Sequence, residues 1–231
     1  MIGIVVIFLA SWLLLYFFES KGLNVLGIFP LKKTIIEFIF GIFYIFLITL
    51  IVIGIDTYTY KIEWNINTNI DYSILAHSFW YHLKSALTED LVFRGAILYI
   101  LVSKLGIRTG LLLSATIFGI YHWFSFEMLN KGIRIIPLLY VFLITGASGF
   151  AWAYAFIKTH SIMMPLGFHV GSNFIFSLYY KNAPYGELVF TELSKIKIED
   201  QWLNLLYLVS KGLIAPVLTI IFIKYWVRKN D

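Results

Sequence analysis

The sequence predicts an all-α fold, a polytopic helical bundle of about seven (six to eight) transmembrane helices that forms one integral membrane domain over residues 1–231. Hydrophobic residues make up 60% of the chain and charged residues only 13%, and the mean hydropathy is +0.83. Soluble chains average about 25% charged residues, so this chain has too little polar material to cover a surface that faces water. Apolar stretches close to the roughly 20 residues that span a bilayer also recur along the chain.

Seven stretches are candidate spans, and in chain order they cover residues 2–18, 34–55, 76–101, 110–126, 135–157, 162–180 and 203–223. The first resembles an uncleaved anchor, because no basic residue precedes it and Lys21, Lys32 and Lys33 follow it. The only long polar connection, residues 181–201, is interpreted as a loop or an interfacial rim. We see no internal repeat, which argues against a transporter built from duplicated halves.

Basic residues gather in the connections that follow the first, third, fifth and seventh spans. These connections lie on one side of the membrane, and the excess of Lys and Arg marks that side as cytoplasmic. We therefore expect the N-terminus outside and the C-terminus in the cytoplasm, in a prokaryotic plasma membrane because the chain is compact and has no targeting extension. Loops at an anionic membrane face then explain the net charge of +5, and nucleic acid is not an expected partner. The basic residues are Lys21, Lys32, Lys33, Lys104, Arg108, Lys158, Lys224, Arg228 and Lys229. The opposite loops hold six Lys and Arg and most of the acids, namely Asp56, Glu63, Asp71, Glu127, Glu187, Glu192, Glu199 and Asp200.

Ionisable residues deep within the spans mark a candidate site, because a charge at the bilayer centre is costly and usually functional. Asp90 and Arg94 lie one helical turn apart and can pair on one face. Glu89 then points about 100° around the helix, without a dedicated counterion, and suits a general base or acid. Alternatively, the Asp90–Arg94 pair only pins helices together and Glu89 is its accessory. Cysteine is absent, which excludes thiolate nucleophiles and thiolate metal sites.

Two further polar groups lie in later spans. His122 follows Phe118 by four residues, and beside a carboxylate it would act as a base or proton shuttle. His169 and Asn173 share one helical face and could donate hydrogen bonds to an oxyanion, or simply bond across helices. The depths of Glu89, His122 and His169 all fall near mid-membrane, so one shared cavity is geometrically feasible.

The motifs Glu-Asp-x-x-x-Arg at Glu89, Phe-x-x-x-His ending at His122 and His-x-x-x-Asn at His169 resemble, in order and spacing, those of the CPBP family. This family, also called Abi, comprises the intramembrane proteases related to CAAX-prenyl proteases and bacteriocin processing. The motif-bearing core covers residues 76–180. The family usually has a second glutamate where this chain has Asp90, a departure that leaves Glu89 unchanged.

The resemblance implies an intramembrane endopeptidase of the glutamic type. Glu89 and His122 would activate a water molecule, while His169 and Asn173 would polarise the scissile carbonyl and hold its oxyanion. Asp90, Arg94 and Phe118 would support the site structurally. The implied partners are the lipid bilayer and a peptide or protein substrate, either membrane-associated or prenylated, which enters from the cytoplasmic side or laterally from the membrane.

Zinc is an alternative, because Glu89, His122 and His169 could bind Zn²⁺ and leave one position open. We favour a mechanism without a metal or other cofactor, since the chain has no His-Glu-x-x-His helix and Asn173 fits an oxyanion donor better than a zinc ligand. Two other functions stay open: a non-catalytic membrane scaffold or bacteriocin-immunity protein of the same fold, and a proton-coupled transporter or channel.

Four other polar residues are interpreted without a role in catalysis. His77 and His82 flank Trp80 near the start of their span and are expected at the membrane interface. Lys84 and Lys211 lie within apolar stretches, and their long side chains are expected to reach the interface.

Overall fold

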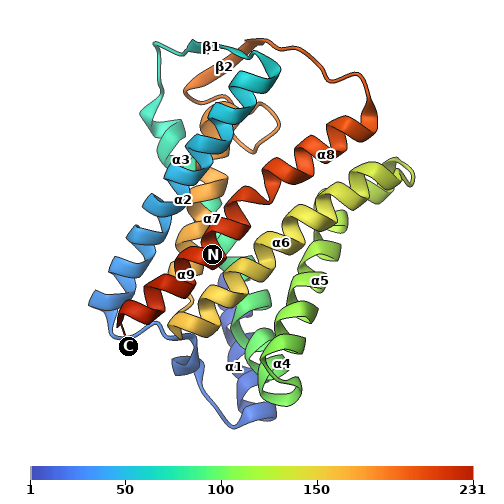
Figure 1. The fold of residues 1–231 in the computed structure, drawn as a ribbon. Coiled ribbons are helices and arrows are strands. Elements are labelled where there is room, and N and C mark those ends of the chain that lie inside the picture. Colours follow the sequence, from blue (N-terminus) through green and yellow to red (C-terminus); the bar gives the residue numbers. More distant parts are fainter. Residues whose placement is uncertain (1, 231) are drawn as a thin grey trace.

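The structure, a computed structural model, describes residues 2–230, with the side chains of residues 3–130 and 132–226. It is a helical bundle, which confirms the predicted all-α class (Figure 1). One short antiparallel pair of strands, β1 and β2, is an addition that the sequence did not predict. In chain order the elements are α1 (Ile2–Glu19), η1 (Leu23–Leu26), α2 (Leu31–Tyr60), β1 (Glu63–Ile66), α3 (Tyr72–Asp90), η2 (Leu91–Ala96), α4 (Ile97–Leu105), α5 (Ile107–Ser125), η3 (Met128–Lys131), α6 (Ile135–Thr159), α7 (Met163–Tyr179), β2 (Phe190–Ser194), α8 (Gln201–Gly212) and α9 (Ile214–Asn230).

Within the described residues, three stretches are long and apolar enough to cross a membrane: Leu23–Tyr60, Ile135–Thr159 and Gln201–Trp226. Gly3–Glu19 is apolar but shorter. Large hydrophobic side chains are exposed along these stretches, among them Phe17, Ile39 and Ile135, as expected for surfaces that face lipid rather than water. The chain is therefore a membrane protein, and the number of crossings stays a prediction.

The predicted span over residues 76–101 is not one regular helix. α3 ends at Asp90, a turn of π-helix covers Leu91–Ala96, and α4 continues from Ile97. Gly95 has φ −80° and ψ −118°, outside the helical range, so the backbone kinks inside this turn. π-Helical turns are rare and frequently lie at functional sites, and this one carries Arg94 of the first motif.

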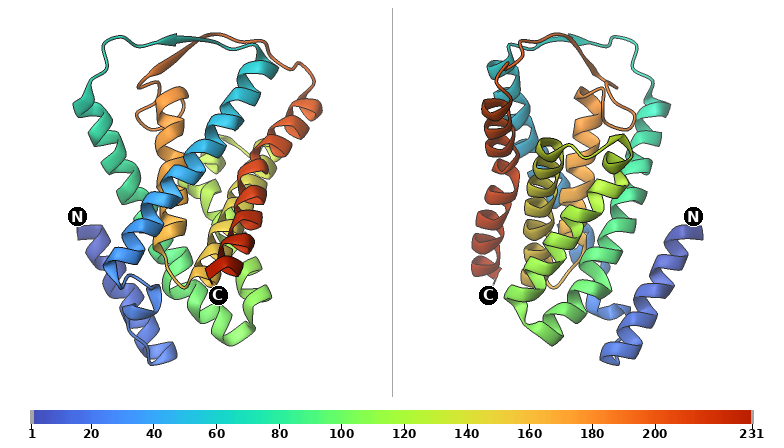
Figure 2. Two further views of the ribbon diagram at one scale, coloured as in Figure 1. Left: turned by 60° about the vertical axis from the view of Figure 1, so that its left-hand side comes forward. Right: turned by 90° about the vertical axis from the view of Figure 1, so that its right-hand side faces the viewer.

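The bundle has two ends, which are named here by their contents (Figure 2). The sheet end holds β1, β2, the start of α3 and the end of α7. The basic end holds the turns from α1 to α2, from α4 to α5 and from α6 to α7. α1 begins about half-way along the bundle, where Gly3 and Ile4 line a groove together with Ser85 and Thr88 of α3, and it ends at the basic end.

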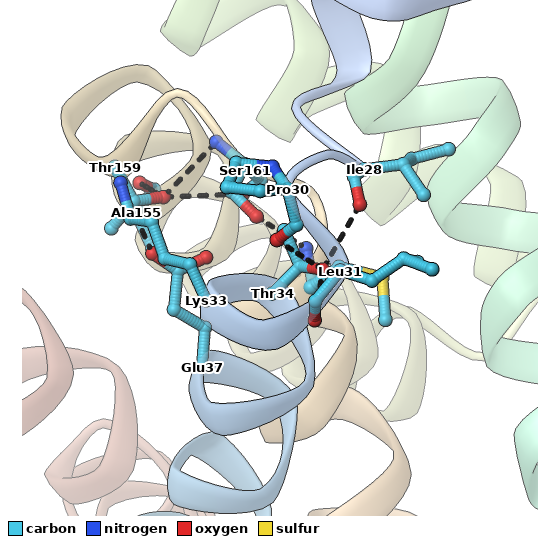
Figure 3. Close-up of polar contacts among 10 residues, drawn as sticks. Ile28, Pro30, Leu31, Lys33, Thr34, Glu37, Ala155, Thr159 and Ser161 are labelled. Carbon is cyan, nitrogen blue, oxygen red and sulfur yellow. Dashed lines mark hydrogen bonds and ion pairs between the residues drawn. The ribbon is translucent and has the colours of Figure 1, made fainter.

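Short polar contacts fix the start of α2 and the end of α6 at the basic end (Figure 3). The Thr34 hydroxyl donates to the carbonyl oxygens of Ile28 (2.9 Å) and Leu31 (3.0 Å), which fixes the entry into α2. The Thr159 hydroxyl donates to the Ser161 carbonyl oxygen at 3.1 Å, which fixes the turn after α6. Each contact is local and stabilises the backbone where a helix begins or ends.

The turn before α2 packs directly on the turn between α6 and α7. Gly27 has φ +63°, and a Cβ atom there would lie 1.8 Å from the His160 carbonyl oxygen, so only glycine fits. The Ile162 N–H donates to the Leu26 carbonyl oxygen at 2.9 Å. A buried apolar cluster, here named the apolar floor, lies behind this junction: Leu26, Leu91, Leu98, Leu111, Ala153, Phe156 and Ile162.

Candidate active site

Four helices surround a cavity of about 470 Å³, and each contributes a stripe of residues at helical spacing. The residues at helical spacing are Tyr81, His82, Ser85 and Glu89 on α3, Phe118, His122 and Ser125 on α5, Ile144, Thr145, Ser148 and Trp152 on α6, and His169, Ser172, Asn173 and Phe176 on α7. Glu89, His122, His169 and Asn173, which the sequence proposed as catalytic, thus line one cavity. Their predicted shared location is confirmed, whereas their roles stay a proposal.

Glu89 is the carboxylate on which the site converges. Its Oε2 atom lies 3.9 Å from His122 Nε2 and 3.8 Å from His169 Nε2, and it has no hydrogen-bond partner among the described residues. The side chain is 14% exposed, so it meets the cavity while most of it is buried. Both separations exceed a direct hydrogen bond, which leaves Glu89 as a carboxylate held between two imidazoles rather than bonded to either.

Both histidines use the other ring nitrogen to bond protein oxygens. His122 Nδ1 lies 2.8 Å from the Phe118 carbonyl oxygen, and His169 Nδ1 lies 3.1 Å from Asp90 Oδ1. Because a carbonyl or carboxylate oxygen can only accept, we assign the proton of each ring to Nδ1. The protein therefore fixes both rings so that Nε2 faces Glu89.

Asp90 joins two of the motifs. The Arg94 Nη1 atom donates to Asp90 Oδ1 at 3.0 Å, and both side chains are fully buried, so the predicted ion pair is confirmed. The same oxygen accepts from His169 Nδ1, a contact that the sequence analysis missed. Asp90 thus fixes the orientation of His169 on the opposite helix, as outer carboxylates often do for functional histidines.

The phenylalanine of the second motif packs on Arg94. The guanidinium carbon lies 3.7 Å from the centre of the Phe118 ring and 5.1 Å from that of Trp152, within the range of cation–π attraction. Gly149 makes room for this packing, since a Cβ atom there would lie 2.7 Å from the Phe118 ring and 3.2 Å from Arg94 Nη2. Trp152 in turn stacks on His169 with 4.4 Å between ring centroids. Aromatic rings therefore form the wall around the buried cation.

His82 was expected at the interface, and that expectation is wrong. It is only 3% exposed, lines the cavity and leaves Nε2 without a hydrogen-bond partner among the described residues. The rest of the ring lies against the Pro184 backbone carbonyl of the loop after α7. The signal was present in the sequence, because residues 82, 85 and 89 follow one helical face.

Lys211 does not reach the interface as expected. Its Nζ atom lies 2.8 Å from both carboxylate oxygens of Asp56, which also accept from Tyr180 at 2.6 Å and Tyr207 at 2.8 Å. Asp56 is buried in α2, although the sequence analysis counted it among loop acids. This Asp56 cluster ties α2 to α8 and to the end of α7, away from the cavity around Glu89.

A second groove, of about 390 Å³, reaches Glu89 from the flank of the bundle. It runs between α1 and α3, where Gly3, Ile4 and Ile7 face Lys84 and Thr88. The groove and the main cavity share Tyr81, Ser85 and Glu89. The Glu89 side chain is therefore reached from the cavity and also from the surface beside α1.

Zinc bound by Glu89, His122 and His169 stays an alternative to the predicted mechanism without a metal. Among the described residues, no group of three or more His, Asp or Glu side chains is arranged to hold a metal ion.

The geometry agrees with a family assignment. A family model described as type II CAAX prenyl endopeptidase Rce1-like matches residues 71–175. This part of the chain is similar to the Rce1-like family. The match runs from the start of α3 to near the end of α7 and contains all three motifs, so the predicted resemblance is confirmed, whereas the core bounds of 76–180 stay a prediction. The searches of curated proteins and of solved structures gave no match.

The family that residues 71–175 resemble is described as one of endopeptidases, and the match covers less than half of the chain. All the motif residues in contact around Glu89 lie inside the matched region. The loop after α7, which contributes Asn182 and Pro184 to the cavity, lies outside it. The residues that converge on Glu89 thus lie within the matched region, and the following loop adds to the lining of the cavity.

Proposed function

We propose that the chain is an intramembrane glutamic endopeptidase, in which Glu89 and His122 activate water and His169 and Asn173 stabilise the oxyanion. One observation carries this proposal: an unpartnered carboxylate oxygen of Glu89 faces the Nε2 atoms of two oriented histidines in a cavity of the Rce1-like region. Convergence of a carboxylate and imidazoles in a cleft is the arrangement that general acid–base catalysis requires.

In the first step a water molecule lies between Glu89 and the scissile carbonyl carbon. The water oxygen attacks this carbon while Glu89 accepts the proton, and His122 holds the water through Nε2. The negative charge collects on the former carbonyl oxygen. The Asn173 carboxamide donates a hydrogen bond to it, and so does His169 Nε2 when both nitrogens of that ring carry protons and Nδ1 donates to Asp90.

In the second step the intermediate collapses. The carbon–nitrogen bond breaks, and the nitrogen takes the proton that Glu89 received from water. The products are a carboxylic acid and an amine, which become a carboxylate and an ammonium when the acid passes its proton to the amine, and Glu89 returns to its ionised form. These two steps use no oxidant, metal or other co-reactant, and a mechanism without a cofactor is part of the proposal.

The proposal also covers the type of membrane, the number of crossings and the side on which each terminus lies. The protein lies in a prokaryotic plasma membrane with about seven crossings, its N-terminus outside and its C-terminus in the cytoplasm. The flank groove between α1 and α3 supports a membrane-associated or prenylated substrate, because it gives an apolar chain a route from the bilayer to Glu89. A cleavage assay on lipidated and unlipidated versions of one peptide separates these substrates.

Cleavage of a quenched-fluorescent peptide library by detergent-purified protein tests the proposal. We expect cleavage by the wild type, none above background by Glu89→Gln, and no effect of a chelator. Glu199→Gln is the matched control, since Glu199 is an exposed acid outside the cavity. Cleavage that survives Glu89→Gln would overturn the proposed role of Glu89, and a well-folded wild type that cleaves nothing would favour the scaffold or immunity function.

A further inference from the structure

The cavity around Glu89 opens at the sheet end of the bundle. Along α3 its lining runs from Glu89 back to Tyr81, toward the start of the helix, and along α7 it runs from His169 forward to Phe176. Eight residues of helix correspond to about 12 Å of depth. The lining ends in the loop after α7, at Asn182 and Pro184, and this loop lies at the sheet end (Figure 2).

The opposite direction is closed. Between the site and the basic end, Phe118 and Trp152 pack around Arg94, and the buried apolar floor lies beyond them. At the basic end itself, Gly27 packs against the His160 carbonyl oxygen too closely for any side chain. Packed side chains therefore lie between the basic end and Glu89, whereas the cavity lining runs toward the sheet end.

The two ends also differ in charge. In the described chain, the acids at the basic end are Glu19 and Glu37, each paired with a lysine, at 3.2 Å from Lys104 and 3.7 Å from Lys33. The other basic side chains there are Lys21, Lys32, Arg108, Lys158 and Lys224. At the sheet end, acids such as Asp71, Glu192 and Asp200 balance the lysines and arginines. An excess of Lys and Arg marks the cytoplasmic side of a membrane protein.

We infer that the cavity opens to the extracytoplasmic side, so that the protease takes an exported peptide that stays associated with the outer half of the bilayer. This inference rests on the proposed function. The peptide substrate then enters from the extracytoplasmic side, whereas the sequence led us to expect entry from the cytoplasmic side or laterally from the membrane. The flank groove fits the same substrate, since α1 begins only half-way along the bundle and the groove lies beside that start.

The chain has no cysteine, so single introduced cysteines report orientation without background. Asn182→Cys places a thiol at the cavity opening, and Thr109→Cys places one at the basic end, both at exposed positions. A membrane-impermeant maleimide is applied to intact cells and to permeabilised cells. We expect Asn182→Cys to label equally in both, and Thr109→Cys to label only after permeabilisation.

The reverse pattern, or equal labelling of both positions in intact cells, would overturn the inference. Ser125→Cys, also exposed and at the cavity, is a second reporter of the opening if Asn182→Cys proves unreactive even in detergent. Because labelling does not depend on cleavage, failure of the orientation and failure of the protease proposal are distinguished. A membrane-impermeant quenched peptide selected from the library completes the test: intact cells should cleave it in a Glu89-dependent way, and a need for permeabilisation would contradict the inference.

Discussion

Two carboxylates buried in the membrane helices, Glu89 and Asp56, are held in opposite ways. Both oxygens of Asp56 accept hydrogen bonds, from Tyr180, from Tyr207 and twice from Lys211, at 2.6–2.8 Å. Glu89 instead leaves Oε2 without a partner in the described structure and turns it toward two imidazoles. A satisfied carboxylate contributes to stability, whereas an unsatisfied one that faces a cavity is available for chemistry.

The comparison shows why depth in the membrane alone does not identify a catalytic residue. Both acids are costly to bury, and the hydrogen-bond partners of each carboxylate determine whether it stabilises the fold or is available for catalysis. Mutations at the two sites should therefore separate activity from stability.

The largest effect is expected for Glu89→Gln. Loss of the general base should lower kcat by roughly 100- to 10,000-fold, because a positioned acid or base contributes about that much to catalysis. The unfolding temperature should change little, since glutamine keeps the size of the side chain and Oε2 has no hydrogen-bond partner among the described residues. Peptide cleavage and thermal unfolding in detergent measure the two quantities, and a variant that retains most of its kcat would contradict the assignment.

Asp56→Asn should act on stability instead. Breaking a buried ion pair from one side leaves Lys211 uncompensated and costs about 3 kcal/mol of unfolding free energy. The cleavage rate per folded molecule should stay close to that of the wild type. The double variant Asp56→Asn with Lys211→Met is the control, because removal of both charges should restore part of the lost stability. A loss of cleavage without a loss of stability would show that the Asp56 cluster serves the reaction.

Asp90→Asn should give an intermediate effect on the reaction. Asp90 touches His169 and not the cavity centre, so the variant should lower kcat by about 10- to 100-fold, as loss of an orienting carboxylate does elsewhere, and leave KM nearly unchanged. The pH–rate profile should also change, because the amide oxygen of Asn carries no negative charge and stabilises a protonated His169 less than the Asp90 carboxylate does. If the rate falls only in proportion to the folded fraction, Asp90 is structural.

The smallest effect is expected for His82→Ala. His82 lines the cavity about two helical turns from Glu89, where it can contact bound peptide through its free Nε2. One hydrogen bond is worth about 0.5–1.5 kcal/mol, so KM should rise about 2- to 10-fold with kcat unchanged. His77→Ala on the exposed side of the same helix is the matched control. Equal kinetics for both variants would exclude a contact between His82 and substrate.

Much of the site was predictable because its information is local. Helical spacing within each motif identified the Asp90–Arg94 pair, the separate direction of Glu89 and the shared face of His169 and Asn173. The hydropathy of the chain likewise predicted a helical membrane bundle.

The missing parts depend on contacts between distant segments. The Asp90–His169 contact joins residues 79 positions apart, and the Asp56–Lys211 pair joins residues 155 apart. The pairing of β1 with β2 is similarly distant, from Glu63 to Ser194. Spacing along one helix cannot predict which helix packs opposite, so Asp56 was taken for a loop acid and Lys211 for an interfacial lysine.

The most direct test of the account measures cleavage rate and unfolding temperature side by side for Glu89→Gln and Asp56→Asn, using one peptide from the library. We expect Glu89→Gln to lose cleavage and keep the unfolding temperature of the wild type, and Asp56→Asn to keep cleavage per folded molecule and unfold at a lower temperature. If Glu89→Gln still cleaves, or if it is inactive only because it has unfolded, Glu89 is not the residue that activates water.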